Sequence, residues 1–406
     1  MPEKMEISGT ALAPALLQLP WELPLEEWPE NVLTALPRGI SRHTVRFVSI
    51  PDGSSTRVIA VKEIGERVAH HEYQMLRELN RLGAPSVTPL AVITGRRDQQ
   101  GEELTACLVT SHLPFSLPYR AVFSQKLRPE VAGKLIDSLA VLLVRLHLLG
   151  FFWGDVSLSN TLFRRDADAF SGYLVDAETG ELAATLSETR RMYDVDVARV
   201  NIIGELMDLE AGGLMDESMD PIAIGSAITQ RYGQLWEELT GEEAIAADET
   251  WRVSDRIRRL NKLGFDAGEL KVVKDEAGET VTIRPQVVDS GHHNRLLMRL
   301  TGLDVQEKQA RRMLNSMHTF QALRFPDLPL EQVAHKWLLD VFLPTVRSVP
   351  PALARKLEPA QIFHEILEHR WYMTEEREGD VSLEEATQSY IKSILPSHRD
   401  EETLLE

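Results

Sequence analysis

Two acidic segments of the sequence carry side chains suited to phosphoryl transfer. In residues 154–160, Asp155 precedes Asn160 by five positions. On a loop, such an aspartate can accept a proton from an attacking hydroxyl, and the asparagine oxygen can bind Mg²⁺. Further along, Asp176 ends a short apolar segment and Glu178 follows it. We expect Asp176 to reach the other side of the metal ion and Glu178 to add a ligand.

Two earlier segments supply a lysine and a glutamate that could pair. Strand-like alternation places Lys62 on the same face as Val58 and Ala60. Such a lysine either extends its ammonium into water at the strand end or is held in place for a functional role. Glu72 falls within the apolar stripe of the following helix, where a carboxylate is costly unless a cation meets it. Lys62 is the obvious partner, and a solvated glutamate at the helix edge is the alternative.

The elements that position these residues follow from periodicity and from turn residues. Residues 1–37 are expected to form a loosely structured arm. The predicted strands are 42–50, 56–64, 106–112, 161–163 and 173–175, with a turn at 51–55. The predicted helices of this half are 68–82 and 129–149, which end at Gly83 and Gly150. Each chemical segment is weak alone, but their order and context together argue against chance.

The first half resembles the protein-kinase-like superfamily, and most closely the bacterial lipopolysaccharide core (Kdo/heptose) kinases and aminoglycoside-type phosphotransferases. The segment that carries the resemblance runs Leu146-His147-x-x-Gly150-x-x-x-Gly154-Asp155-x₄-Asn160. The resemblance covers residues 42–209. It implies an α+β, two-lobed kinase-like fold that binds ATP in a cleft between a sheet-rich and a helical lobe.

The same resemblance assigns roles to residues of the nucleotide site. Ala60 would touch adenine, and Lys62, held by Glu72, would bind the α- and β-phosphates. Residues 108–113, with Leu108 and His112, would form the hinge beside adenine.

On the catalytic side, the resemblance makes Asp155 the base and gives Mg²⁺ to Asn160 and Asp176. Asp194 or Asp196 would be the helix aspartate that braces the catalytic loop.

Several departures from the family pattern bear on activity. No Gly-x-Gly-x-x-Gly loop precedes Lys62, and Gly53 alone stands where the phosphate-covering turn is expected. Trp153 replaces the usual histidine two places before the catalytic aspartate, and Ala177-Glu178 replaces Phe-Gly. The absence of an Ala-Pro-Glu segment before Tyr193 counts against an ordinary protein kinase. The intact base and metal positions favour an active enzyme.

The second half is expected to be helical and to pack against the large lobe. Predicted helices are 222–239, 251–263, 305–320, 331–343 (closed by Pro344), 360–373 and 383–395, interrupted by a hairpin of 270–273 with 281–283. Segments 302–312 and 364–372 resemble a helical domain of unknown function joined to such kinase-like halves. In the latter, His364 and His369 are five apart, which places them on different helix faces and opposes a zinc site. His364 and Glu368 could share a metal, but a solvated helix face is the favoured interpretation.

Composition limits the remaining functional classes. The 406 residues carry a net charge of −18, which argues against a nucleic-acid partner or an anionic membrane. The single cysteine, Cys107, excludes an intrachain disulfide and is expected to fill the core. No secretory signal or membrane span is visible, so a cytoplasmic location is expected.

The sequence therefore predicts an N-terminal arm (1–37), a kinase-like domain (38–209) and a helical C-terminal domain (210–406). The expected activity is ATP- and Mg²⁺-dependent phosphate transfer to a hydroxyl of a small molecule, a sugar or a glycolipid precursor. The alternatives are a catalytically weak or dead nucleotide-binding scaffold that binds a partner protein through its C-terminal domain, and AMP transfer from the same site.

Overall fold

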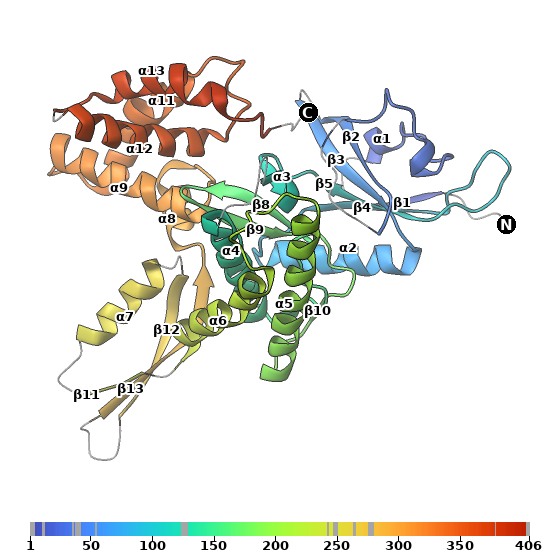
Figure 1. Ribbon diagram of the computed structural model, residues 1–406, viewed down its shortest axis with the longest axis horizontal. Coiled ribbons are helices and arrows are strands. Elements are labelled where there is room, and N and C mark those ends of the chain that lie inside the picture. The colour runs from blue at the N-terminus through green and yellow to red at the C-terminus, as the bar shows by residue number, and fades with distance from the viewer. Residues whose placement is uncertain are drawn as a thin grey trace. The chain divides into compact units, whose positions relative to one another are not determined.

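The computed structural model describes residues 5–9, 13–34, 36, 42–52, 55–122, 129–241, 243–246, 251–262, 265–274, 280–377 and 379–402. The chain forms two compact units (Figure 1). The first contains Met1–Arg164 and Gly172–Gln230, and the second contains Arg165–Ser171 and Arg231–Glu402. The first unit combines sheets and helices, whereas the second is mostly helical. The predicted α+β fold class is confirmed.

The small lobe of the first unit is built on a five-stranded antiparallel sheet. Its strands are β1 (Glu6–Gly9), β2 (Val45–Asp52), β3 (Ser55–Glu63), β4 (Pro89–Thr94) and β5 (Cys107–Ser111), in the order β1-β4-β5-β3-β2. Helix α2 (Glu66–Arg81) lies along one side of this sheet (Figure 1). In β3, Ile59 and Val61 are fully buried, while Lys62 lies on the opposite, half-buried face. The alternation that the sequence predicts is therefore confirmed.

The expectation of a loosely structured arm is wrong for the described part of residues 1–37. Strand β1 pairs with β4, and the short helix α1 (Ala13–Leu16) lies on the side of the sheet opposite α2 (Figure 1). Trp21 and Trp28 are buried, with their ring centroids 5.2 Å apart, against the face that carries Ile59 and Val61. This part of the arm is ordered because the indole rings cover an apolar sheet face that would otherwise be exposed to water.

Arg96 joins the arm to the sheet. Its guanidinium is fully buried and donates to the carbonyls of Trp21 and Leu23 and to Glu63 Oε1 at 2.8 Å. It also contacts the sulfur of Cys107, whose pKa is raised to about 12 by burial. The thiol is therefore protonated at neutral pH, and the expectation that Cys107 fills the core is confirmed.

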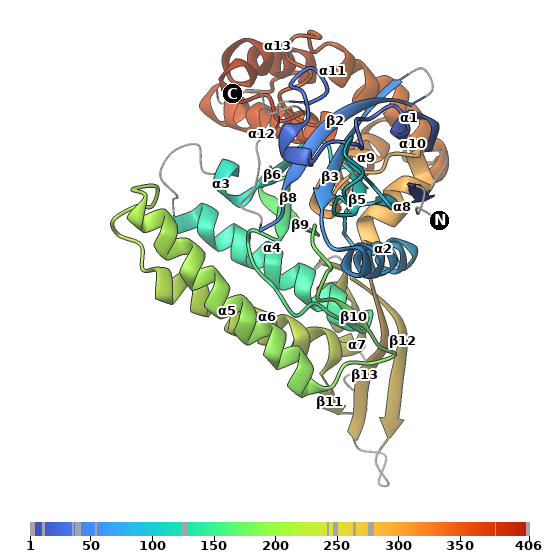
Figure 2. The same ribbon diagram turned by 90° about the vertical axis from the view of Figure 1, so that its right-hand side faces the viewer.

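The large lobe of the first unit consists of long helices and short strands (Figure 2). In chain order these are β6 (Ser116–Pro118), α3 (Tyr119–Val122), α4 (Pro129–Leu148), β7 (Phe151–Phe152), β8 (Thr161–Asp166), β9 (Ala169–Leu174), β10 (Glu181–Leu182), α5 (Glu188–Ala211) and α6 (Pro221–Thr240). Helix α4 is largely apolar, and eleven of its twenty residues are buried in the core of the lobe. Helices α5 and α6 cross at Gly225, where an added Cβ would lie 2.5 Å from Ile203. Within the described residues, no helix is long and apolar enough to cross a membrane.

The second unit joins a three-stranded sheet to a group of helices. The sheet is β11 (Glu243–Ala246), β13 (Thr280–Ser290) and β12 (Phe265–Lys274), and the helices are α7 (Trp251–Lys262), α8 (His292–Thr301), α9 (Glu307–Arg324), α10 (Leu330–Trp337), α11 (Leu343–Arg347), α12 (Pro359–Arg377) and α13 (Leu383–Ser393). Pro344 does not close the fourth predicted helix. A π-helical turn at Leu338–Phe342 precedes α11, and proline is tolerated in the first turn of the new helix.

The tip of the β8–β9 hairpin, Arg165–Ser171, also belongs to the second unit. There, the buried carboxylate Oδ1 of Asp166 accepts hydrogen bonds from the backbone N–H groups of Lys308 (2.8 Å) and Gln309 (2.9 Å) in the first turn of α9. A carboxylate at this position satisfies free amides and complements the helix dipole. This aspartate therefore supports the first turn of α9, which Gln306 and Gln309 also cap, although it lies 142 residues away along the chain from Lys308.

The solvated helix face predicted at His364–His369 is wrong for its first two residues. His364 is only 7% exposed, and Glu365 accepts hydrogen bonds from Tyr390 (2.7 Å), Gln361 (3.0 Å) and His398 (3.1 Å). Burial opposes ionisation of Glu365, but these donors hold its pKa at about 2. This part of α12 is therefore a packed polar network between helices.

Replacing Glu365 by glutamine should test this network through its dependence on pH. A carboxyl whose pKa falls on folding stabilises the native state above its unfolded pKa of about 4.5 and loses that contribution as the pH falls toward 2. The shift corresponds to roughly 3 kcal/mol of unfolding free energy. Urea denaturation followed by circular dichroism should give a steep loss of stability between pH 4.5 and 2 in the wild type and a shallower one in the variant. Equal slopes would contradict the assignment.

Candidate active site

The centre of the site is the ammonium group of Lys62. Its Nζ lies 2.9 Å from Glu72 Oε2 on α2 and 2.7 Å from Asp176 Oδ2, just after β9. The predicted Lys62–Glu72 ion pair is therefore confirmed. Glu72 Oε1 also accepts from the backbone N–H of Ala177 at 3.4 Å. Through these contacts, one lysine connects the small-lobe sheet, helix α2 and the loop after β9.

Electrostatics keep this lysine charged. Burial alone would lower the pKa of Lys62, but the carboxylates of Glu72 and Asp176 outweigh it and raise the pKa. Burial raises the pKa of Glu72 to about 7, against the opposing attraction of the Lys62 ammonium. Lys62 therefore stays positively charged at neutral pH. Glu72 is the carboxyl of the cluster whose pKa is raised by burial.

The predicted adenine-side residues lie on the same sheet face as Lys62. In the register of β3 with β5, Lys62 lies opposite Leu108 and Ala60 lies opposite Thr110. His112 follows β5 and donates its backbone N–H to the carbonyl of Val58 at 3.0 Å. Burial lowers the pKa of His112 to about 4, so its ring is neutral at pH 7. The structure thus brings together Ala60, Lys62, Glu72, Leu108 and His112.

The loop 154–160 places Asp155 and Asn160 in contact. Asn160 Nδ2 lies 3.1 Å from Asp155 Oδ2 and 3.0 Å from the Asp155 carbonyl oxygen. The carbonyl oxygen of Asn160 accepts from the backbone N–H of Val175 at 3.1 Å, next to Asp176. The loop leaves α4 through Gly150 at φ 81°, where a Cβ would lie 2.0 Å from the carbonyl oxygen of Ala183. Glycine is required at this turn for both reasons.

Helix α5 braces the loop with Asp194, which settles the choice between Asp194 and Asp196. The Asp194 carboxylate is fully buried and accepts from the backbone N–H groups of Trp153 (2.8 Å) and Gly154 (2.7 Å). It also contacts His147 Nε2 at 3.1 Å. Asp196 is instead exposed and pairs with Arg199.

Two further residues of α5 hold the loop and were not predicted. Asn201 Nδ2 donates to the Val156 carbonyl oxygen at 3.0 Å and lies 3.4 Å from Asp155 Oδ1. Glu205 accepts from the backbone N–H of Leu158 at 2.9 Å and from Ser159. Seven and eleven residues after Asp194, both fall on the same face of the helix. The sequence signal was therefore available: polar side chains within an otherwise apolar helical stripe.

Trp153, which replaces the histidine of the family pattern, connects the segment before Asp155 to the segment that carries Asp176. The indole is fully buried, and its Nε1 donates to the carbonyl oxygen of Asp176 at 2.8 Å. In return, Thr179 Oγ1 donates to the carbonyl oxygen of Trp153 at 2.7 Å. A tryptophan at this position therefore still links the two segments by hydrogen bonds.

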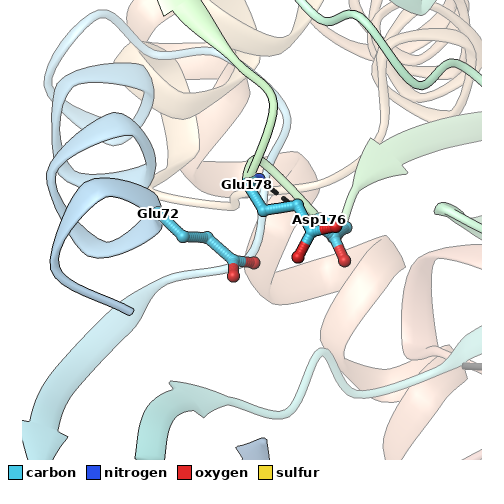
Figure 3. Close-up of side chains that lie close together, drawn as sticks. All are labelled: Glu72, Asp176 and Glu178. Carbon is cyan, nitrogen blue, oxygen red and sulfur yellow. Dashed lines mark hydrogen bonds between the residues drawn. The ribbon is translucent and has the colours of Figure 1, made fainter. Parts of the chain in front are cut away.

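The acidic residues of the site have the donor set that suits a magnesium ion. Oxygen atoms of Glu72, Asp176 and Glu178 lie within 4.8 Å of one another (Figure 3). Such carboxylate oxygens are preferred ligands of Mg²⁺. Glu72 is only 1% exposed, whereas Asp176 and Glu178 are 22% and 17% exposed, so the latter two are the carboxylates that an ion can reach. The amide oxygen of Asn160 is the third candidate ligand.

Gly53, which stands where the phosphate-covering turn is expected, lies outside the described residues. The strand register places the residues on either side of it: Asp52 pairs with Ser55, and Val45 pairs with Lys62. Ser55 lies seven positions before Lys62 on β3, which is roughly 23 Å at about 3.3 Å per residue. The segment directly before Val45 lies next to the lysine instead.

That segment contacts two of the acidic residues. Arg42 Nη2 lies 2.9 Å from Asp155 Oδ2, and His43 Nε2 lies 3.2 Å from Glu178 Oε2. Neither residue was singled out in the sequence. A basic pair placed directly before the first strand of the lysine hairpin was the only signal for them.

Comparison with known proteins finds a family model that matches part of each half of the chain. Residues 56–200 match the model of the lipopolysaccharide kinase (Kdo/WaaP) family, and residues 234–395 match a domain of unknown function, DUF4032. A solved structure titled "WaaP in complex with acyl carrier protein" is 16% identical, with a TM-score of 0.35, and the match covers 64% of this chain and 99% of that one. No curated protein matches the chain.

The two family-model matches confirm the predicted resemblance to lipopolysaccharide kinases and to a joined domain of unknown function. The stretch that matches the kinase family model, residues 56–200, lies largely within the first unit. The site geometry described above lies within that unit.

Proposed function

We propose that the chain is an ATP- and Mg²⁺-dependent phosphotransferase that acts on a hydroxyl of a small molecule, a sugar or a glycolipid precursor. The observation that supports this most directly is the buried Lys62 ammonium between Glu72 and Asp176. It links the strand that would line the adenine site to the loop that would bind the metal. The match to a lipopolysaccharide kinase family favours an acceptor that contains sugar.

In this mechanism, Asp155 accepts the proton of the acceptor hydroxyl. The hydroxyl oxygen attacks the γ-phosphorus, and the bond from that phosphorus to the β–γ bridging oxygen breaks, leaving its electron pair on ADP. Lys62 would hold the α- and β-phosphates. Mg²⁺, held by Asn160, Asp176 and Glu178, would neutralise charge on the phosphates. The hydrogen bonds of Asp194 would keep the loop in position during the reaction.

A nucleotide-binding scaffold is the second candidate, with a partner protein on the C-terminal domain. The observation in its favour is the 2.9 Å ion pair of Arg42 with Asp155, because it engages the proposed base. AMP transfer would use the same residues with ATP lying in the opposite direction, so it must be separated from phosphate transfer by experiment.

The test combines nucleotide binding with isotope transfer. Thermal unfolding of the full chain is measured with ATP and Mg²⁺ for the wild type and for Asp176→Ala. Asp52→Ala is the matched control, since Asp52 is a small-lobe carboxylate paired with Arg57 far from Lys62. We expect Mg²⁺-dependent stabilisation that is lost only in Asp176→Ala.

Turnover then distinguishes the candidates. Transfer of the γ-label of ATP to material in a cell extract supports the phosphotransferase, and transfer of the α-label indicates AMP transfer instead. Stabilisation without turnover favours the scaffold. No stabilisation by any nucleotide contradicts the proposed function altogether.

We further propose that residues 38–209 provide this activity in the cytoplasm, where ATP is supplied. Residues 210–406 would then contribute a surface for the acceptor or for a partner protein. This division is tested by expressing the full chain and by mapping which peptides become protected from hydrogen exchange when ATP is added.

A further inference from the structure

Arg42 and His43 bring basic side chains onto the carboxylates that the proposed function uses. They directly precede β2, whose first residue, Val45, lies opposite Lys62 in the sheet. Arg42 lies 2.9 Å from Asp155 and His43 lies 3.2 Å from Glu178. One basic side chain therefore meets the proposed base, and the other meets a proposed metal ligand.

The contact between Arg42 and Asp155 is a weak one. The arginine side chain is 77% exposed and Asp155 is 28% exposed. Exposed ion pairs contribute little to stability because water screens them and because two long side chains lose freedom. The guanidinium can therefore leave the carboxylate at little cost if a stronger anion enters the site.

The position of Asp155 defines which anion this would be. A base that takes the proton of the attacking hydroxyl must lie next to the γ-phosphate, since that hydroxyl attacks the γ-phosphorus. A guanidinium that reaches Asp155 is thus also within reach of the γ-phosphate. Its planar donors match phosphate oxygens in two parallel hydrogen bonds, and the interaction is stronger than with an exposed carboxylate.

We propose that Arg42 binds the γ-phosphate of ATP and that its pairing with Asp155 is the arrangement of the nucleotide-free site. This inference rests on the proposed function. When ATP binds, the guanidinium moves from Asp155 to the phosphate, and the base is released to accept the proton of the acceptor. Arg42 would thereby replace contacts that a glycine-rich turn makes with phosphate through its backbone.

Equilibrium titration of the full chain with Mg²⁺ and two nucleotides tests this assignment. One nucleotide is the non-hydrolysable β,γ-imido analogue of ATP, and the other is ADP. In Arg42→Ala, we expect the analogue to bind about 10- to 100-fold more weakly, as for a lost charge-assisted hydrogen bond, with ADP affinity within about twofold of the wild type. Arg42→Lys should bind the analogue more tightly than Arg42→Ala but more weakly than the wild type, because lysine keeps the positive charge but lacks the planar pair of donors.

The control is Arg57→Ala, since Arg57 also forms an ion pair on this sheet, with Asp52, but at the far end of β3. It should leave both affinities unchanged. Unchanged affinities in Arg42→Ala, or an equal loss for both nucleotides, would overturn the assignment while leaving the proposed function intact. Failure of the wild type to bind either nucleotide would overturn both.

Discussion

Replacing Asp155 by asparagine is expected to lower the rate of phosphate transfer by about 10²- to 10⁴-fold, the range typical of a lost general base. The substitution keeps the size of the side chain and one of its two oxygens. That oxygen can keep one of the contacts with Asn160 Nδ2 (3.1 Å, to Oδ2) and Asn201 Nδ2 (3.4 Å, to Oδ1), and Asn160 Nδ2 also keeps its bond to the backbone carbonyl of residue 155 at 3.0 Å. Nucleotide affinity should stay within a few-fold of the wild type, and the loss should appear in kcat.

The measurement is release of ADP and transfer of the γ-label at saturating ATP. Asp52→Asn serves as the matched control, because Asp52 is a partly exposed carboxylate that also pairs with an arginine. Its rate should equal that of the wild type. An Asp155→Asn enzyme that retains a third or more of the wild-type rate would exclude Asp155 as the base.

Replacing Asp194 by alanine should strongly destabilise the first unit. The substitution leaves the backbone N–H groups of Trp153 and Gly154, together with the His147 ring, without their buried acceptor. Each unsatisfied buried donor costs about 1–3 kcal/mol. Allowing for partial relaxation, we expect the unfolding free energy to fall by about 3–5 kcal/mol.

Asp196→Ala is the control for this prediction, because it removes an aspartate from the same helix two residues later. Asp196 is 66% exposed and pairs with the neighbouring Arg199 in a contact that water screens. Its removal should change stability by less than about 1 kcal/mol. Urea denaturation of the two variants should separate them clearly. Equal losses would mean that Asp194 does not hold the catalytic loop.

Much of the candidate site could be predicted from the sequence because its signals are local. Glu72 was recognised as a polar residue in an apolar helical stripe, and Lys62 by alternation along one strand. The loop from Asp155 to Asn160 is a contiguous motif, and it follows Gly150 and Gly154, which the backbone geometry requires. Such features depend on residues close in the chain, and secondary structure alone fixes which face they occupy.

Other features depended on contacts between distant segments. The buried tryptophans of the first 37 residues have no strand-like or helical pattern, and only the sheet that they cover explains their order. Glu365 lies on a helix that is polar on several sides. Its hydrogen-bond partners include residues of α13 and of the segment that follows, so the sequence of the helix alone wrongly predicted a solvated face.

The sequence by itself predicted that the first half is kinase-like, identified Lys62 as the candidate partner of Glu72, and showed which residues form the acidic groups. Only the tertiary structure decided that Asp194 braces the loop that carries Asp155 and that Arg42 and His43 reach the acidic residues. The physical reason is register. Which turn of a hairpin lies beside Lys62, and which aspartate of α5 points toward the loop, depends on how strands pair and how helices pack. That pairing is set by burial of surfaces from the whole unit, which no single segment encodes.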